Sequence, residues 1–220
     1  MNDLIDRLHA TDIADHPFLQ RVGSEQPDMS DFQALLANAR EFARRLVRWY
    51  ALLIARLHDA RLQSLLARQL NDELGGGDPS QIHIDGYDAL LAALRPFERA
   101  GDRSPGERFA SSMDACYTAA DADEAVGTVI AAEVRGWQMN QWIGMTLQRQ
   151  QALPLEQLDW YHVHAEVEQE HAQDSAALYA LLDSDARRDA AARGAAAFDQ
   201  VLWRFLDEMQ TACVNGATPG

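Results

Sequence analysis

Three residues in the C-terminal third of the chain have the types and the spacing of metal ligands. His164, Glu168 and His171 lie at positions i, i+4 and i+7. On an α-helix each residue turns by about 100°, so these positions share a stripe roughly 60° wide. Two imidazoles and a carboxylate on one stripe are able to bind the same metal ion. His162 and Glu166 fall on the other side of this helix, where we expect them to point away from the ion.

A second carboxylate lies on the preceding apolar segment. By helical spacing, Glu133 shares a face with Val126 and Ile130. Burying a carboxylate is costly unless it is paired or binds a metal. Glu133 is therefore either a ligand or the partner of an arginine on a neighbouring helix.

Two further candidates flank the run Gly75-Gly76-Gly77. Glu73 precedes these glycines and His83 follows them. Alone they are compatible with solvated residues at helix ends. The full set supplies three carboxylates and three imidazoles, which suits two divalent ions, and in particular oxygen-activating iron. Its members are Glu73, His83, Glu133, His164, Glu168 and His171.

Two other metal sites are excluded by spacing. Glu168-x-x-His171 matches the ferritin motif, but that bundle needs a second Glu-x-x-His on another helix, and the sequence contains none. Structural zinc is usually bound by cysteines, and Cys116 and Cys213 lack ligand spacing.

The elements that must position these residues are predicted to be helices. Alanine, leucine and arginine are abundant and β-branched residues are sparse, which favours helix over sheet. The pattern predicts an all-α bundle of about seven helices in one domain spanning residues 1–220, with a frayed tail over 215–220. The expected helices cover residues 3–13, 30–57, 61–74, 87–95, 107–119, 121–151, 154–182 and 185–214.

Composition excludes several classes of protein. The formal net charge is −15 and lysine is absent, which argues against a nucleic-acid-binding surface. No segment has the pattern of a signal peptide or of a membrane-spanning helix. Two cysteines are too few for a disulfide framework, so we expect a cytoplasmic protein.

Four pieces of the sequence together resemble the heme-oxygenase-like diiron oxidases and oxygenases, relatives of the TenA and PqqC folds. The segment NDELGGGDPSQIH is similar to that family's Glu, glycine-rich turn and His, and Glu133 lies at the family's distance before the last cluster. His164-x-x-x-Glu168-x-x-His171 resembles its closing motif. The segment ADHPFLQRVG, before the first long helix, is also typical of it.

The resemblance implies a heme-oxygenase-like bundle whose six ligands hold two irons per chain when fully loaded, with one ion often weakly bound. It implies a reaction in which dioxygen oxidises a small substrate, such as an amino acid, an amine or a fatty acid. The outcome ranges over hydroxylation, N-oxygenation, desaturation and cleavage. Whether the chain forms a homodimer is left open.

Aromatic and basic residues near the predicted ligands are candidates for the substrate pocket. Trp49, Tyr50, Trp137 and Trp160 could line it, although an ordinary core role is the alternative for each. Arg135, like Arg48, is a candidate partner for a substrate carboxylate.

Other functions compete with the diiron hypothesis. A heme protein of this fold would need a proximal histidine, such as His9 or His16, and would leave the six-residue set unexplained. A TenA-type thiaminase would need a nucleophilic cysteine, and the two cysteines lie in segments unlike that family's. A cofactorless PqqC-like oxidase would not need all these carboxylates. A non-catalytic metal-binding or partner-binding protein remains the alternative from another class.

Overall fold

The computed structural model describes residues 3–98, 102–119, 121–150 and 174–216. These residues contain helices and no strand, which confirms the all-α prediction. Residues 174–180 are also helical, within the helix expected over 154–182. The other elements are α1 (Asp3–His9), η1 (Ile13–Asp15), α2 (Pro17–Val22), α3 (Met29–Arg56), α4 (Ala60–Glu73), η2 (Pro79–Gln81), α5 (His83–Ala93), η3 (Arg95–Phe97), α6 (Ser104–Tyr117), α7 (Ala122–Gln150) and α9 (Asp185–Gly216).

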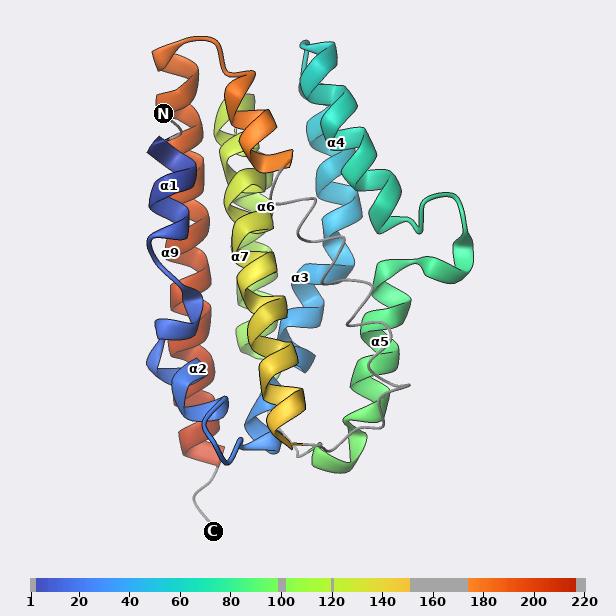
Figure 1. Cartoon of the computed structure of the whole chain (residues 1–220), viewed down its shortest axis with the longest axis vertical. Coiled ribbons are helices and arrows are strands. Elements are labelled where there is room, and N and C mark those ends of the chain that lie inside the picture. The colour runs from blue at the N-terminus through green and yellow to red at the C-terminus, as the bar shows by residue number, and fades with distance from the viewer. Residues whose placement is uncertain (1–2, 99–101, 120, 151–173, 217–220) are drawn as a thin grey trace.

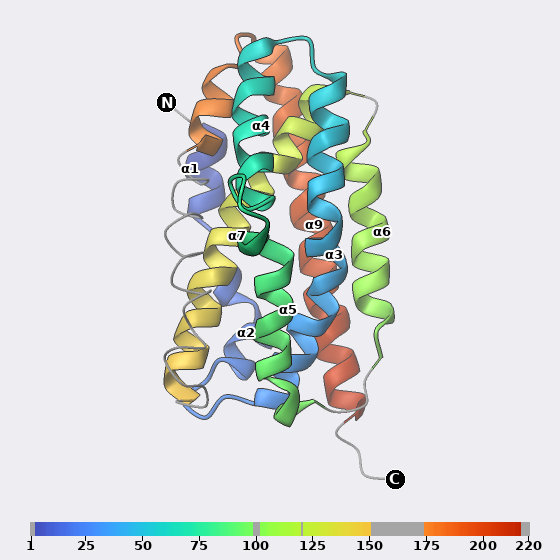
Figure 2. The same ribbon diagram turned by 90° about the vertical axis from the view of Figure 1, so that its right-hand side faces the viewer.

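Four long helices form the body of the bundle. Figures 1 and 2 show α3, α6, α7 and α9 running along the long axis of the molecule. The short helices α1 and α2 lie on one side, where α1 contacts α7 and α2 contacts α9. On the other side, α4 and α5 follow one another from top to bottom and both contact α3. One contiguous apolar core joins these helices.

Among the described helices, the most extensive contact is between α7 and α9, and it depends on two glycines. A Cβ atom at Gly127 would overlap the carbonyl oxygen of Ala191, and one at Gly194 would overlap that of Glu124. Small residues at such contacts let two helix backbones approach closely. This close approach fixes the position of α7, the helix that carries Glu133.

Several helix ends differ from the predicted ones because of their capping groups. The long helix α3 begins at Met29 rather than Ser30, since the Asp28 carboxylate accepts hydrogen bonds from the backbone N–H groups of Ser30 and Asp31. His16-Pro17 starts a new helix, with Pro17 at its first position. The helix predicted from residue 87 already starts at His83. The last helix continues to Gly216, two residues into the predicted tail.

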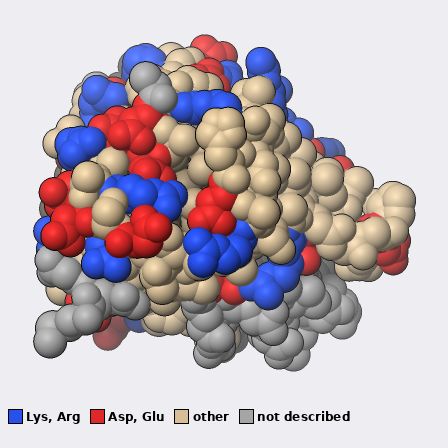
Figure 3. Space-filling model, turned by 90° about the horizontal axis from the view of Figure 1, so that it is seen from above, with Lys and Arg blue, Asp and Glu red and all other residues tan. Residues whose placement is uncertain are grey.

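Acidic and basic side chains alternate at the end of the bundle where α7 and α9 begin (Figure 3). Arg187 donates two hydrogen bonds of 2.9 Å to Asp123, and Arg193 donates one of 2.8 Å to Glu124. Arginines on α9 thus neutralise carboxylates in the first turn of α7. No helix among the described residues is both long enough and apolar enough to cross a membrane.

We predict that Gly194→Ala lowers the stability of the protein, although alanine favours helix by about 0.5–1 kcal/mol over glycine. The added methyl would force α9 away from α7, at a cost of about 1–3 kcal/mol. Urea unfolding measures the change. Ala196→Gly, at an exposed position of the same helix, measures the effect of helix propensity alone. If Gly194→Ala instead raises the free energy of unfolding by as much as Ala196→Gly lowers it, the close contact is disproved.

Candidate metal centre

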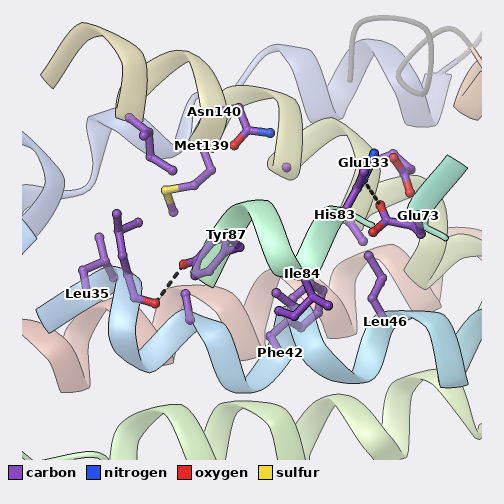
Figure 4. Close-up of a pocket in the computed structure, with 16 residues that line it drawn as sticks. Leu35, Phe42, Leu46, Glu73, His83, Ile84, Tyr87, Glu133, Met139 and Asn140 are labelled. Carbon is purple, nitrogen blue, oxygen red and sulfur yellow. Dashed lines mark hydrogen bonds and ion pairs between the residues drawn. The ribbon is translucent and has the colours of Figure 1, made fainter. Parts of the chain in front are cut away.

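Three of the six predicted ligands lie around one pocket between α3, α5 and α7. The pocket has a volume of about 180 Å³, and Glu73, His83 and Glu133 are part of its wall. Figure 4 shows these three residues together at one end, with Leu35, Tyr87 and Met139 toward the other. Glu73 ends α4, His83 begins α5, and Glu133 lies in the middle of α7. Residues 60 positions apart in the sequence thus share one small space.

A tight glycine turn brings Glu73 and His83 together. Gly75, Gly76 and Gly77 have φ values of 86°, 63° and 96°, in the left-handed region that favours glycine. The loop bulges outward and returns to the bundle before α5 continues in the direction of α4 (Figure 1), and Nδ1 of His83 lies 3.3 Å from Oε1 of Glu73. Both side chains are mostly buried, with exposed fractions of 12% and 13%. The turn therefore creates an imidazole–carboxylate pair at the pocket wall.

The third candidate, Glu133, is buried and hydrogen-bonded to a tyrosine. Only 6% of Glu133 is exposed, and its Oε1 accepts a hydrogen bond from the hydroxyl of Tyr50 on α3. Burial, followed by the negative charge of Glu133, raises the pKa of Tyr50 well above its ordinary value. Tyr50 therefore stays protonated and acts as a donor, which orients a carboxylate that would otherwise be costly to bury.

The rest of the described pocket wall is mainly apolar. Asn140 adds an amide on the same side of α7 as Glu133, two turns further along the helix. Tyr87 lies on α5, and its hydroxyl donates a 2.8 Å hydrogen bond to the carbonyl oxygen of Leu36. The apolar members are Leu35, Leu36, Ala39, Phe42, Ala43, Leu46, Ile84, Ala132, Gly136, Met139 and Ile143. Such a wall suits the hydrocarbon part of a small organic molecule.

The other three predicted ligands, His164, Glu168 and His171, lie outside the described residues, as do His162 and Trp160. Within the described residues no three His, Cys, Asp or Glu side chains are grouped as a metal site. Glu73, His83 and Glu133 line the same end of the pocket, and their role as ligands stays a prediction. Their carboxylates and imidazole are the donors that non-heme iron takes, and so they fit that metal.

Among the described residues, Tyr50 contacts the predicted ligand Glu133, whereas Trp49 and Trp137 pack elsewhere in the bundle. Trp49 is buried outside the described pocket wall, with its Nε1 donating a 2.7 Å hydrogen bond to Asp114. Trp137 packs its ring edge-to-face against His9, 6.1 Å between ring centres, and is not part of that wall. Trp49 and Trp137 thus support the packing of the bundle.

Arg135 is a structural residue and does not face the described pocket. Two residues along a helix turn by about 200°, so Arg135 and Glu133 point to opposite sides of α7. The buried guanidinium donates hydrogen bonds of 2.9 and 2.8 Å to both oxygens of Asp199 on α9. It also donates to the backbone carbonyl oxygens of Leu8 and Thr11, at 2.8 and 2.6 Å. Arg135 therefore ties the N-terminal segment and α9 to α7.

Two buried polar residues near the centre were not predicted. The hydroxyl of Tyr117 and both amide atoms of Gln69 are buried and have no hydrogen-bond partner among the described residues. A buried polar group without a partner costs about 1–3 kcal/mol. Gln69 follows Leu62 and Leu66 on one face of α4, and this spacing is the signal that could have revealed it.

Comparisons with known proteins follow this geometry. A family model described as iron-containing redox enzyme matches residues 33–203. A CADD-like protein of unknown function from Nostoc punctiforme has a solved structure with a TM-score of 0.76 and 15% identity, covering 96% of this chain and 95% of that one. The structure of a domain of unknown function with a heme oxygenase-like fold from Shewanella denitrificans gives a TM-score of 0.67 at 13% identity. The match covers 95% of this chain and 88% of that one. A comparison with curated proteins gives no match.

We predict that Arg135→Gln destabilises the fold by roughly 3 kcal/mol, because it breaks a buried ion pair and leaves two backbone carbonyl groups without their donor. Chemical denaturation followed by circular dichroism measures this change. The matched control is Arg48→Gln, at an exposed position on α3, where we expect a change within about 0.5 kcal/mol. Equal effects of the two substitutions would contradict the structural role of Arg135.

Proposed function

The chain belongs to the family of iron-containing redox enzymes, and we propose that it is a non-heme diiron oxidase or oxygenase that uses dioxygen to oxidise a small organic substrate. The observation that carries this proposal is the grouping of Glu73, His83 and Glu133 at one end of an apolar pocket. The heme-oxygenase-like fold shared with the solved structures supports it.

In this proposal the ligands come from both parts of the chain. Glu73, His83 and Glu133 would hold iron together with His164, Glu168 and His171 of the predicted C-terminal motif. Carboxylates are able to bridge two ions and imidazoles bind as terminal ligands, so the set suits two irons. Bound iron supplies the ability to reduce dioxygen, which the side chains of the protein lack.

The described residues would bind, orient and exclude water. Tyr50 holds the Glu133 carboxylate in one orientation through its hydrogen bond. The mostly buried Glu73 and His83 face each other, with His83 Nδ1 3.3 Å from Glu73 Oε1. The apolar wall excludes water and binds the hydrocarbon part of the substrate, while the Asn140 amide is available for one polar group.

The surroundings of His16 favour a non-heme site over a heme site. Its Nδ1 accepts a 3.1 Å hydrogen bond from the backbone N–H of Phe18, and its Nε2 donates a 3.2 Å hydrogen bond to Asp207. Both ring nitrogens are engaged, and the side chain is buried where α2 packs against α9. His16 thus acts as a helix cap, and the heme hypothesis loses one of its two candidate ligands.

We predict that the purified, metal-free protein binds about two ferrous ions per chain when it is titrated without oxygen. Addition of dioxygen should then produce a transient absorbance in the visible range. Isothermal titration calorimetry and stopped-flow spectroscopy measure the two effects. A protein that takes up no ferrous iron would disprove the proposal, and one that binds iron but gives no oxygen-dependent signal would support a metal-binding protein without this activity.

Single substitutions identify the ligands. His83→Ala and Glu133→Gln should each weaken iron binding by at least about 100-fold, since loss of even an outer-shell group costs 10- to 100-fold. The exposed His58 provides the matched control, and His58→Ala should leave iron binding unchanged. His164→Ala should abolish binding at one site, whereas His162→Ala should not. If His162→Ala abolishes iron binding at one site and His164→Ala does not, the assignment of the ligand face of this helix is wrong.

A further inference from the structure

Two buried polar residues, Tyr117 and Gln69, have no hydrogen-bond partner for their side-chain polar atoms among the described residues. Tyr117, at the end of α6, stacks on Trp49 with 4.7 Å between ring centres and an interplanar angle of 7°. Its ring centre is 6.5 Å from that of Phe42, which is part of the pocket wall. Burial, and then the charge of Glu133 with a smaller effect of Glu73, raises the pKa of Tyr117 well above its ordinary value. Its hydroxyl therefore stays protonated and is able to donate a hydrogen bond.

Gln69 approaches the same place from α4. It lies one helical turn before Glu73, and positions i and i+4 are about 40° apart, so the two side chains share a face. Gln69 is fully buried, with an exposed fraction of 0%, whereas Glu73 reaches the pocket wall. The buried Gln69 amide is thus one helical turn from Glu73 on the same face of α4.

Tyr117 differs in this respect from Tyr50 and Tyr87, whose hydroxyls both have partners. The hydroxyl of Tyr50 donates to Glu133, and that of Tyr87 donates to Leu36. Native proteins rarely leave a buried polar group without a partner, and where they do, a water molecule or a ligand is commonly involved. Phenylalanine at 117 and leucine at 69 would fill similar volumes without this cost.

We propose that Tyr117 and Gln69 are positioning residues of the iron site, and that their hydroxyl and amide bind water that enters the site together with the ion. This inference rests on the proposed function, since it requires a metal held by Glu73 and Glu133. Water bound in this way would link the two side chains to the carboxylate ligands. Tyr50 orients Glu133 directly, and Tyr117 and Gln69 would orient the ligand shell through water.

The test compares metal-free and iron-loaded protein. In the metal-free protein Tyr117→Phe removes an unsatisfied hydroxyl, so the thermal midpoint should rise by about 2–4 °C. The same substitution should weaken ferrous iron binding by about 10- to 100-fold in an anaerobic calorimetric titration. The opposite signs of the two effects are the signature of a group that is satisfied only when metal is present. Gln69→Leu should likewise raise the thermal midpoint of the metal-free protein and weaken the binding of ferrous iron.

Tyr87→Phe is the matched control, because Tyr87 is a half-buried tyrosine of the pocket wall whose hydroxyl already has a partner. It should lower the thermal midpoint of both forms and leave iron affinity unchanged. If Tyr117→Phe and Gln69→Leu leave iron affinity unchanged, or if Tyr117→Phe lowers the midpoint of the metal-free protein as Tyr87→Phe does, the inference is wrong while the proposed iron site stands. A wild-type protein that binds no iron would overturn both.

Discussion

The hydrogen bond between Tyr50 and Glu133 is the interaction on which the centre of this structure depends. A carboxylate in the middle of a bundle loses most of its hydration, and this loss must be offset by a strong partner. Tyr50 supplies a protonated donor from α3, so two long helices are held in register at one point. Glu73 and His83 then reach the same pocket from a third direction. The polar centre is thus anchored to helices rather than to loops.

Helix α7 combines three tasks on different faces. Gly127 allows close packing on α9, Arg135 binds Asp199 and the N-terminal segment, and Glu133 faces the pocket. Because α7 packs extensively on α9, the rotation of α7 about its axis is firmly set. The direction of Glu133 is therefore determined by packing on the opposite side of its helix.

Much of this arrangement could be predicted because it follows from helical periodicity. The burial of Glu133 follows from its apolar neighbours on the same face, and the glycine run indicated the turn between Glu73 and His83. The same arithmetic excludes Arg135 from the pocket, since an offset of two residues reverses the direction of a side chain. Its role required knowledge of Asp199 on α9, a tertiary contact that no local pattern contains.

Other features could not be predicted, because they depend on contacts between distant segments. Tyr117 looks like any aromatic on an apolar face, and only the fold stacks it on Trp49 and brings its ring near Phe42 of the pocket wall. The start of α3 is set by Asp28, which caps the helix two residues before Ser30, where the helix was predicted to begin. The helix that carries His164, Glu168 and His171 lies outside the described residues, so its ligand face stays a prediction.

The three left-handed glycines between α4 and α5 have a consequence for how this chain is able to vary. A side chain at Gly75 would also overlap the carbonyl oxygen of Asp78, whereas the space around Gly76 and Gly77 is open. The barrier to change at the last two positions is thus only the handedness of the backbone, which asparagine or aspartate tolerates better than other residues. The distance between Glu73 and His83 thus depends on the left-handed backbone of this loop, whether or not a metal is bound. At Gly76 and Gly77 we therefore expect asparagine or aspartate to be tolerated and β-branched residues to be excluded.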